Sequence, residues 1–77
     1  MSGSLASAAV GTRVRIVTTQ LEPDAAAWLA AVGLAEGEEV TVLRRAALGG
    51  PLHVRIASGG EFAIARELAS LLTVEAA

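Results

Sequence analysis

The chain has 77 residues, which is the length of one small domain and leaves no room for a second. Its formal net charge is −2, from six arginines and eight carboxylates, and this balance argues against nucleic acid as the main partner. Cysteine is absent, which excludes disulfides and thiolate metal sites and fits a reducing cytosol.

The beginning of the chain has little apolar surface to bury. Met1–Ser4 is expected to be disordered, or to be a cloning remnant, and residues 5–77 are expected to form the single domain. Leu5 is expected to pack loosely against that domain. Met1–Thr12 lacks the positive start and apolar middle of a signal peptide, and no stretch is long enough to span a membrane.

Alternation of apolar and polar residues predicts a first strand over Thr12–Thr18. Arg13 and Arg15 fall on its outer face. The inner face is expected to carry Val14, Ile16 and Thr18.

A short helix is predicted over Pro23–Val32, with Pro23 suited to its first position and Gly33 to the left-handed residue after its end. One face of this helix carries Ala25, Trp28, Leu29 and Val32. A helix of this length is marginal alone in water, so Trp28, Leu29 and Val32 are expected to pack on the sheet. Truncating Trp28 or Phe62 is expected to cost about 3–5 kcal/mol.

Four further strands and one helical turn follow. The alternating pattern and the glycine-rich turns place the strands at Glu39–Arg45, Leu52–Ala57, Glu61–Ala65 and Leu71–Glu75. The helical turn is expected at Arg66–Ser70, before the last strand. The inner faces are expected to carry Val40, Val42, Leu52, Val54, Ile56, Phe62 and Ile64. Five short strands with one helix inserted after the first predict a mainly β fold, a small SH3-like barrel that removes its own sheet edges.

The order of these signals resembles the FeoA family. The stretches that carry the resemblance are Val10–Ile16, Trp28–Val42, Gly49–Val54 and Ala63–Arg66. The resemblance implies a cytoplasmic SH3-like barrel, without enzymatic activity or a cofactor, that works with FeoB, a membrane transporter of ferrous iron with a cytosolic GTPase domain. It also implies that the same fold occurs as a C-terminal domain in metal-dependent repressors. The chain departs from the family pattern at Val32, where Leu is usual, and at Gly50, where Asp is frequent.

Candidate metal ligands are few. His53 is the lone histidine, it shares the outer face with Arg55, and it is expected to be a solvated surface residue. Glu36, Glu38 and Glu39 form a small acidic cluster that could attract a divalent cation, but a solvated acidic turn is the favoured interpretation.

Catalytic chemistry has little support in the sequence. Ser58 lies in a glycine turn and has no general base placed beside it. The segment 58–60 also lacks the lysine and the following helix of a phosphate-binding loop.

Exposed arginine and leucine side chains are the candidates for protein binding. Outward arginines on adjacent strands can recognise carboxylates of a partner, although a solubilising face is the favoured interpretation. Arg66, at a position that recurs in the family, is expected to bond backbone carbonyls. Leu48 lies in a hairpin tip, where it either marks a docking site or folds over the barrel mouth. The candidate partner-binding residues are Leu43, Arg44, Arg45, Leu48 and Arg55.

The sequence therefore favours a non-enzymatic accessory protein that binds the cytosolic GTPase domain of a FeoB-type transporter and reaches the membrane only through it. Self-association through an exposed apolar patch is a further expectation. The alternative is a free-standing regulatory barrel, related to the repressor domain, that binds another protein.

Overall fold

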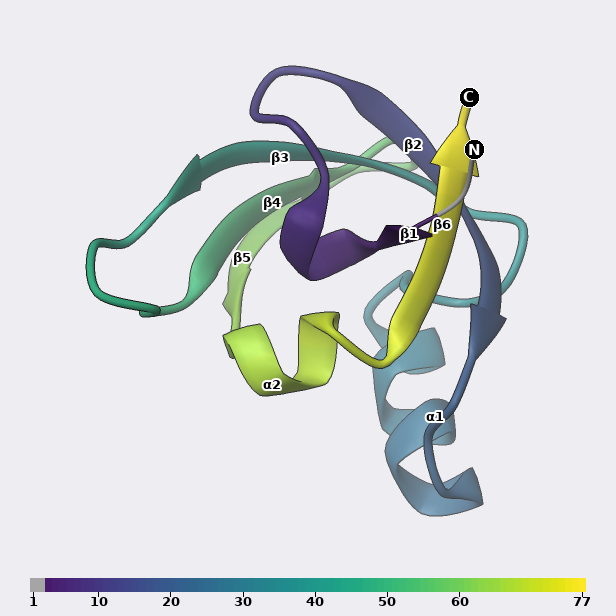
Figure 1. Cartoon of the computed structure of the whole chain (residues 1–77). Helices are drawn as coiled ribbons and strands as arrows, with labels where there is room; N and C mark the ends of the chain where they lie inside the picture. The colour runs from purple at the N-terminus through teal and green to yellow at the C-terminus, as the bar shows by residue number, and fades with distance from the viewer. Residues whose placement is uncertain (1–2) are drawn as a thin grey trace.

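The computed structural model describes residues 3–77, and of Thr18 the backbone only. Six strands form one antiparallel sheet in the order β1-β6-β2-β3-β4-β5 (Figure 1). The strands are β1 (Gly3–Ser4), β2 (Arg13–Thr19), β3 (Glu39–Arg45), β4 (Leu52–Ile56), β5 (Glu61–Ile64) and β6 (Leu72–Ala76). The helical elements are the 3-10 helix η1 (Leu5–Ser7), α1 (Pro23–Ala31) between β2 and β3, and the single turn α2 (Arg66–Ala69) before β6.

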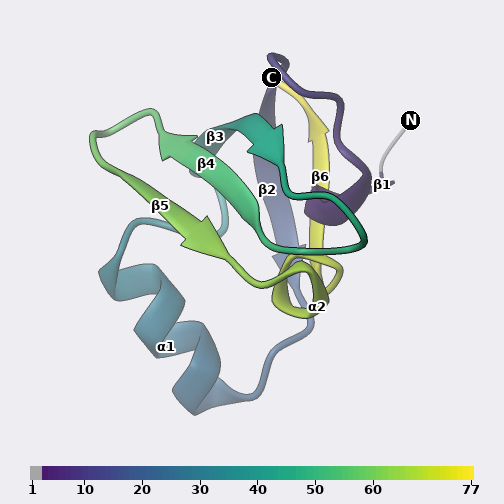
Figure 2. The ribbon, with the colours of Figure 1, turned by 90° about the vertical axis from the view of Figure 1, so that its left-hand side faces the viewer.

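The predicted mainly β fold with one inserted helix is confirmed, but the sheet is not closed as a barrel. Strands β1 and β5 form its two ends, so the expectation that the fold removes its own edges is wrong for the part of the chain described. Figure 2 shows the reason, because the chain passes through α2 between β5 and β6 and these successive strands do not pair.

Gly3 and Ser4 form a short strand, which corrects the expected disorder at these two residues. They pair with β6 in the register Gly3↔Val74 and Ser4↔Thr73. The next residue, Leu5, is completely buried and packs tightly, where loose packing was expected. The backbone of the strand completes the edge of β6 while Leu5 anchors it. Met1 and Ser2, also expected to be disordered, lie outside the described residues.

The hydrophobic core is built almost entirely from aliphatic side chains. All the inward-facing strand residues predicted from alternation belong to it, except that Phe62 is only partly buried at its margin and the side chain of Thr18 is not among those described. The buried set is Leu5, Ala8, Val14, Ile16, Leu29, Leu34, Val40, Val42, Leu52, Val54, Ile56, Ile64, Ala69, Leu72 and Val74.

A β-bulge in β3 changes which arginine faces outward. Val42 is opposite Val54 and Arg44 is opposite His53, so Leu43 is an extra residue without a partner of its own. Arg44 therefore shares the outer side with His53, and Arg45 shares the side of the buried Leu52. Strict alternation places Arg45 on the outer face, and the bulge reverses that.

The end of α1 agrees with the prediction. The Leu34 N–H donates to the Leu29 carbonyl at 2.9 Å and the Gly33 N–H donates to the Ala30 carbonyl at 3.0 Å. Gly33 has a φ of 102°, so this is a Schellman motif with glycine at its left-handed position. Val32 is the C-cap residue, one position after the last helical residue.

The predicted packing of α1 is only partly right. Leu29 is 1% exposed, but Trp28 is 61% exposed and Val32 is 40% exposed, so the expectation that they pack on the sheet is wrong. Figure 1 shows α1 projecting below the sheet, so that its far side meets solvent. No described helix has the length and apolar character needed to cross a membrane.

Candidate protein-binding site

The loop of the β3–β4 hairpin, residues 46–51, carries a fully exposed leucine at its tip. The Ala46 N–H donates to the Pro51 carbonyl at 3.0 Å, and the Gly50 N–H donates to the Ala47 carbonyl at 3.2 Å. Between these bonds Leu48 has a φ of 61° and is 105% exposed. The left-handed region costs a leucine about 1–2 kcal/mol. Leu48 therefore does not fold over the sheet, which settles that alternative.

Gly50 occupies the position where the family frequently has an aspartate, and the hairpin leaves no room there for a side chain. A Cβ atom at Gly50 would lie 2.7 Å from the Cβ of Ala46 and 3.3 Å from the Ala47 carbonyl oxygen. Any side chain here would require the loop to shift. The hairpin therefore carries no carboxylate at position 50, and its large exposed side chain is Leu48.

A shallow pocket of about 210 Å³ lies at the base of this hairpin. Its walls combine two arginines and a histidine with small apolar groups. The lining residues are Arg44, Arg45, Ala46, Pro51, Leu52, His53 and Ala63.

A chain of polar contacts crosses the outer faces of β3, β4 and β5. Arg44 Nη2 lies 2.9 Å from His53 Nδ1. Arginine only donates, so Nδ1 accepts and the proton of the neutral ring is on Nε2. His53 Nε2 lies 3.3 Å from Glu61 Oε1 without the geometry of a hydrogen bond. The His53 side chain is 29% exposed, so it is held between neighbours and is less solvated than predicted.

Glu61 ends this chain of contacts on the edge strand β5. Arg55 donates to Glu61 Oε2 from both Nε and Nη2, each at 3.1 Å. These hydrogen bonds lower the pKa of the Glu61 carboxyl, and His53 acts in the same direction. Arg55 is therefore paired within the sheet, although it stays exposed.

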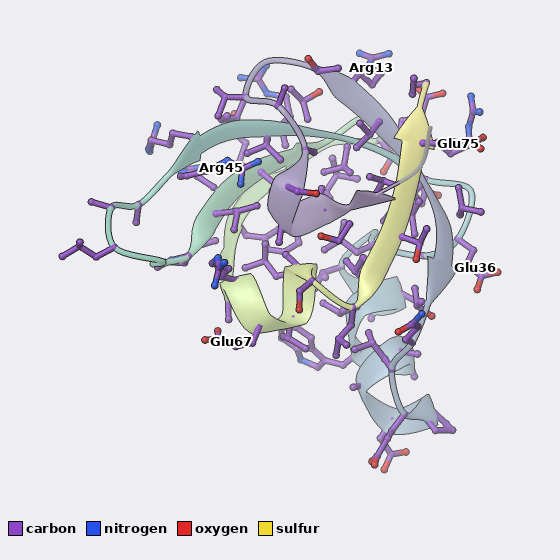
Figure 3. The ribbon with its side chains drawn as sticks, viewed as in Figure 1. Arg13, Glu36, Arg45, Glu67 and Glu75 are labelled. Carbon is purple, nitrogen blue, oxygen red and sulfur yellow. The ribbon has the colours of Figure 1, made fainter. Side chains whose placement is uncertain are left out.

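Arg45 has a different role from the other candidates. Its guanidinium donates from Nη1 to the Ala6 carbonyl and from Nη2 to the Ala8 carbonyl. Figure 3 shows Arg45 reaching from β3 toward η1. It therefore ties the N-terminal segment to β3, a contact that sequence reasoning missed because the bulge at Leu43 has no clear sequence signal.

Arg66 begins α2 and lies beside the hairpin. A Cβ atom at Gly49 would be 4.0 Å from both Cδ and Nη1 of Arg66. The resemblance led us to expect bonds from Arg66 to backbone carbonyls, and the described contacts contain none. The Arg66 side chain is exposed and adds a positive charge near Leu48.

The acidic turn does not gather its carboxylates. Glu39 accepts from Arg13 at 3.4 Å and from Arg15 at 3.1 Å, and Arg15 also reaches Glu75 at 3.5 Å. Glu36 points to solvent from the loop before β3 (Figure 3). Residues 3–77 hold no group of three or more histidine, aspartate or glutamate side chains placed for a metal ion. Direct cation binding at Glu36, Glu38 and Glu39 stays the less favoured of the two interpretations of this turn.

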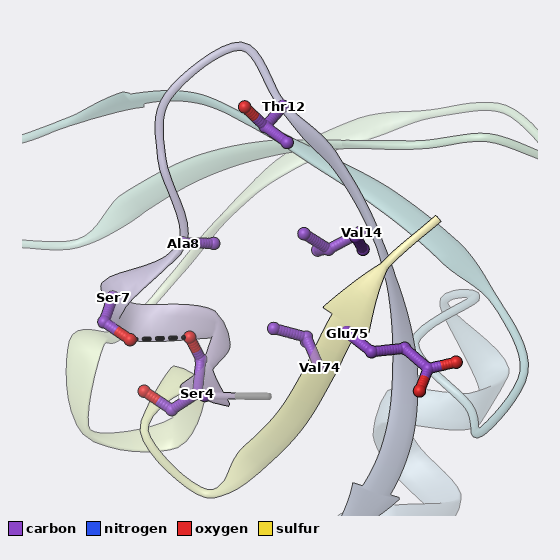
Figure 4. Close-up of a pocket in the computed structure, with 9 residues that line it drawn as sticks. Ser4, Ser7, Ala8, Thr12, Val14, Val74 and Glu75 are labelled. Atoms are coloured by element: carbon purple, nitrogen blue, oxygen red, sulfur yellow. Dashed lines mark hydrogen bonds between the residues drawn. The ribbon is translucent and has the colours of Figure 1, made fainter. Parts of the chain in front are cut away.

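A second pocket, of about 400 Å³, separates the N-terminal segment from β2 and β6 (Figure 4). Ser7 Oγ donates to the Ser4 carbonyl at 3.1 Å on one wall, and Ala8, Val14 and Val74 line the interior. Among the described lining residues, small apolar groups dominate the interior, and the carboxylate of Glu75 is directed away from it.

A family model described as FeoA domain matches residues 3–76. The chain belongs to the FeoA family. Among solved structures, a FeoA described as an iron uptake regulatory protein has a TM-score of 0.83 and 27% identity, over 97% of this chain and 96% of that one. The sequence-based assignment to this family is confirmed. No curated protein sequence gives a significant match.

Two more solved structures place this FeoA-family chain by its fold. The FeoA of Stenotrophomonas maltophilia, complexed with zinc and described as a prokaryotic SH3 domain protein, has a TM-score of 0.72 and 26% identity, over 94% of this chain and 88% of that one. The SH3-like fold is therefore confirmed. A manganese-dependent transcriptional repressor has a TM-score of 0.86 but 18% identity, over 99% of this chain and 42% of the repressor, which shows a shared fold alone.

Proposed function

We propose that this chain is a non-enzymatic cytoplasmic accessory protein of ferrous iron transport. In this proposal it binds the cytosolic GTPase domain of a FeoB-type membrane transporter and modulates nucleotide turnover or assembly. Membership of the FeoA family supports the iron-transport role. The Stenotrophomonas maltophilia relative, which has been considered a ferrous iron transport activating factor, supports it as well.

The observation that carries the docking surface is Leu48. Its side chain is fully exposed and its backbone lies in a region that leucine rarely occupies. Such strain persists where the surrounding structure enforces it, and it is concentrated at binding and switch sites. An apolar anchor beside a basic rim is a common form of protein-binding surface. We therefore place Leu48 at the centre of the interface.

The other candidate residues have distinct positions around this anchor. Arg44 lines the pocket at the hairpin base and is exposed, so it can pair with a carboxylate of the partner. Leu43 is half-buried on β3 beside Arg44, whereas Arg55 lies farther from the hairpin, opposite Thr41, and is paired with Glu61. Arg45 supports the surface from behind through its bonds to the N-terminal segment.

The surroundings of Ser58, the serine considered as a nucleophile, agree with a binding role for the protein. Ser58 is exposed in the turn after β4, and His53 is engaged with Arg44. Among the described side chains, the serine hydroxyls that form hydrogen bonds donate to backbone carbonyls, and no serine or threonine hydroxyl is bonded to a histidine or carboxylate base. The chain therefore acts, in our proposal, by contact with the transporter.

Calorimetric titration of the cytosolic domain of a FeoB-type transporter with this protein tests the proposal. We expect the wild type to bind and Leu48→Asp to weaken binding at least about tenfold. Val10→Asp is the matched control, because Val10 is also exposed, at 53%, but lies in the loop before β2. Arg44→Glu is a better second variant than Arg45→Glu, because Arg45 holds the N-terminal segment. Absence of binding by the wild type would remove the proposal.

The alternative is a free-standing regulatory domain, related to the repressor domain, that binds a transcription factor or another protein. The repressor with TM-score 0.86 favours it through the fold alone. A transcription factor gene beside this one, with no FeoB-type gene nearby, would favour that alternative.

A further inference from the structure

The charged side chains of this molecule divide into a paired set and two groups without ion-pair partners. Three arginines on the outer face of the sheet form ion pairs with carboxylates of neighbouring strands. The arginines without a carboxylate partner in the described part are Arg44, Arg45 and Arg66. All three lie around the β3–β4 hairpin, because Arg44 and Arg45 end β3 and Arg66 is next to Gly49.

Carboxylates without an ion-pair partner gather around α1. Glu22 is the N-cap of this helix, Asp24 is in its first turn, and Glu36 lies in the loop after it. No arginine occurs between residues 16 and 43. Two described carboxylates lie near the hairpin group: Glu67, which is beside Arg66 on α2 (Figure 3), and Glu61, which is already paired with Arg55. The molecule therefore has a basic end at the hairpin and an acidic end at α1.

The acidic end also carries an exposed apolar surface. Trp28 of α1 and Val32, its C-cap residue four positions later, are 61% and 40% exposed. Ala27 and Ala31 beside them are exposed as well, and Leu29 is the one buried residue among the nine of α1. A helix that is apolar on every side is ordinarily buried. An exposed aromatic and aliphatic face of this kind marks an interaction site.

The basic end carries the matching protrusion. Leu48 stands out from the hairpin, and in both Figure 1 and Figure 2 the hairpin and α1 lie on different sides of the molecule. One end thus presents an apolar anchor with a basic rim, and the other presents an apolar face with an acidic rim. Both halves of a complementary contact are present on the same chain.

We propose that the hairpin of one copy of this chain docks on α1 of a second copy. Leu48 packs against Trp28 and Val32, and Arg44 and Arg66 face Asp24 and Glu22 of the second copy, while Arg45 stays bonded to the N-terminal segment of its own chain. The two surfaces differ, so the contact is head-to-tail and leads to rings or open chains. The contact covers the hairpin surface proposed for the transporter, so self-association and transporter binding exclude each other.

Sedimentation equilibrium of the purified chain tests this contact. We expect the mean mass to rise with protein concentration up to about 1 mM, and the association to weaken as salt screens the charges. Leu48→Ser and Trp28→Ser should each lower the association constant at least about tenfold. Val10→Ser, an exposed valine away from both surfaces in the sequence, is the matched control and should associate as the wild type does.

Mixing the two variants gives the sharpest result. Leu48→Ser keeps an intact α1 face and Trp28→Ser keeps an intact hairpin, so a mixture restores one contact per pair. We expect 1:1 dimers in the mixture and no larger species. A symmetric contact would instead depend on one surface alone, and mixing would not restore it.

Folding of each variant is checked by circular dichroism. If Trp28→Ser does not fold, the charge reversals Asp24→Arg and Arg66→Glu, which should restore association when mixed, replace the pair. A monomeric wild type at about 1 mM, or a mixture that stays monomeric, overturns the proposal. Trp28→Ser should still bind the transporter domain, so failure here and failure of the proposed function are distinguishable.

Discussion

Gly33 has two functions at the end of α1. Its φ of 102° completes the Schellman motif, and its missing side chain leaves space for Ile56. A Cβ atom here would lie 3.0 Å from Ile56 Cγ2, closer than carbon atoms ordinarily pack. Gly37, four residues later, has a φ of 90° but has nothing within 4 Å of its Cβ position. A substitution at Gly37 therefore introduces backbone strain alone, whereas one at Gly33 introduces both backbone strain and a close contact with Ile56.

Gly33→Ala is expected to lower the free energy of unfolding by about 2–4 kcal/mol, the sum of backbone strain and overpacking. Gly37→Ala carries the strain alone and is expected to cost about 1–2 kcal/mol. Urea unfolding followed by circular dichroism measures both. Equal losses would mean that Ile56 moves aside without cost.

At the scale of the element, α1 is held to the domain at few points. Leu29 is its one buried residue, and the capping bonds at Leu34 lock its end. A helix of nine residues is not stable in water by itself, so this anchor decides whether it forms. Trp28, the largest side chain of the helix, contributes mostly exposed surface.

Leu29→Ala is expected to destabilise the protein by about 2–5 kcal/mol, because it opens a cavity in the core. Trp28 is mostly exposed, so the cost of about 3–5 kcal/mol expected from the sequence is corrected, and Trp28→Ala is expected to change stability by less than about 1 kcal/mol. Thermal unfolding of the two variants at low protein concentration, where copies do not associate, makes the comparison. A larger loss at Trp28 would show that α1 packs more deeply than described.

The sequence predicted the elements better than their faces. Period-two alternation located β3 at its observed bounds, because one face of that strand is buried over most of its length. It did not predict the bulge at Leu43, since nothing in Val-Leu-Arg-Arg distinguishes a bulge from regular pairing. The helical pattern correctly predicted α1 but not that Trp28 is exposed, because periodicity identifies an apolar face and not what covers it.

In the candidate site, too, the sequence predicted which residues are present but not how they are oriented. Leu48 and the hairpin were predicted from the Gly-Gly-Pro turn. The different roles of Arg44 and Arg45 depend on the bulge, and the outward projection of Leu48 depends on its φ of 61°. Neither follows from residue type, so both required the structure.

At the scale of the whole molecule, Arg45 connects segments far apart in the chain. It bonds the carbonyls of Ala6 and Ala8 from the end of β3. The Gly11 N–H also donates to the Val42 carbonyl at 2.8 Å, which adds a second tie between the same segments. These bonds and Leu5 hold the N-terminal segment against the sheet.

Arg45→Met is expected to speed amide hydrogen exchange in residues 3–11 by about tenfold or more, because the segment loses two charge-assisted bonds. Exchange in β4 and β5 should change less. Arg44→Met, which removes a neighbouring arginine without contacts to this segment, is the matched control. Exchange that rises equally throughout the protein would contradict a local role for Arg45.

The pairing of Gly3 with Val74 has a consequence for protein engineering. It brings the first and last strands, β1 and β6, side by side (Figure 1). A unit with adjacent ends can be spliced into a surface loop of a host protein without pulling the flanking host residues apart. The same adjacency permits circular permutation, in which a short linker joins the old ends and new ones are opened in a turn such as residues 58–60.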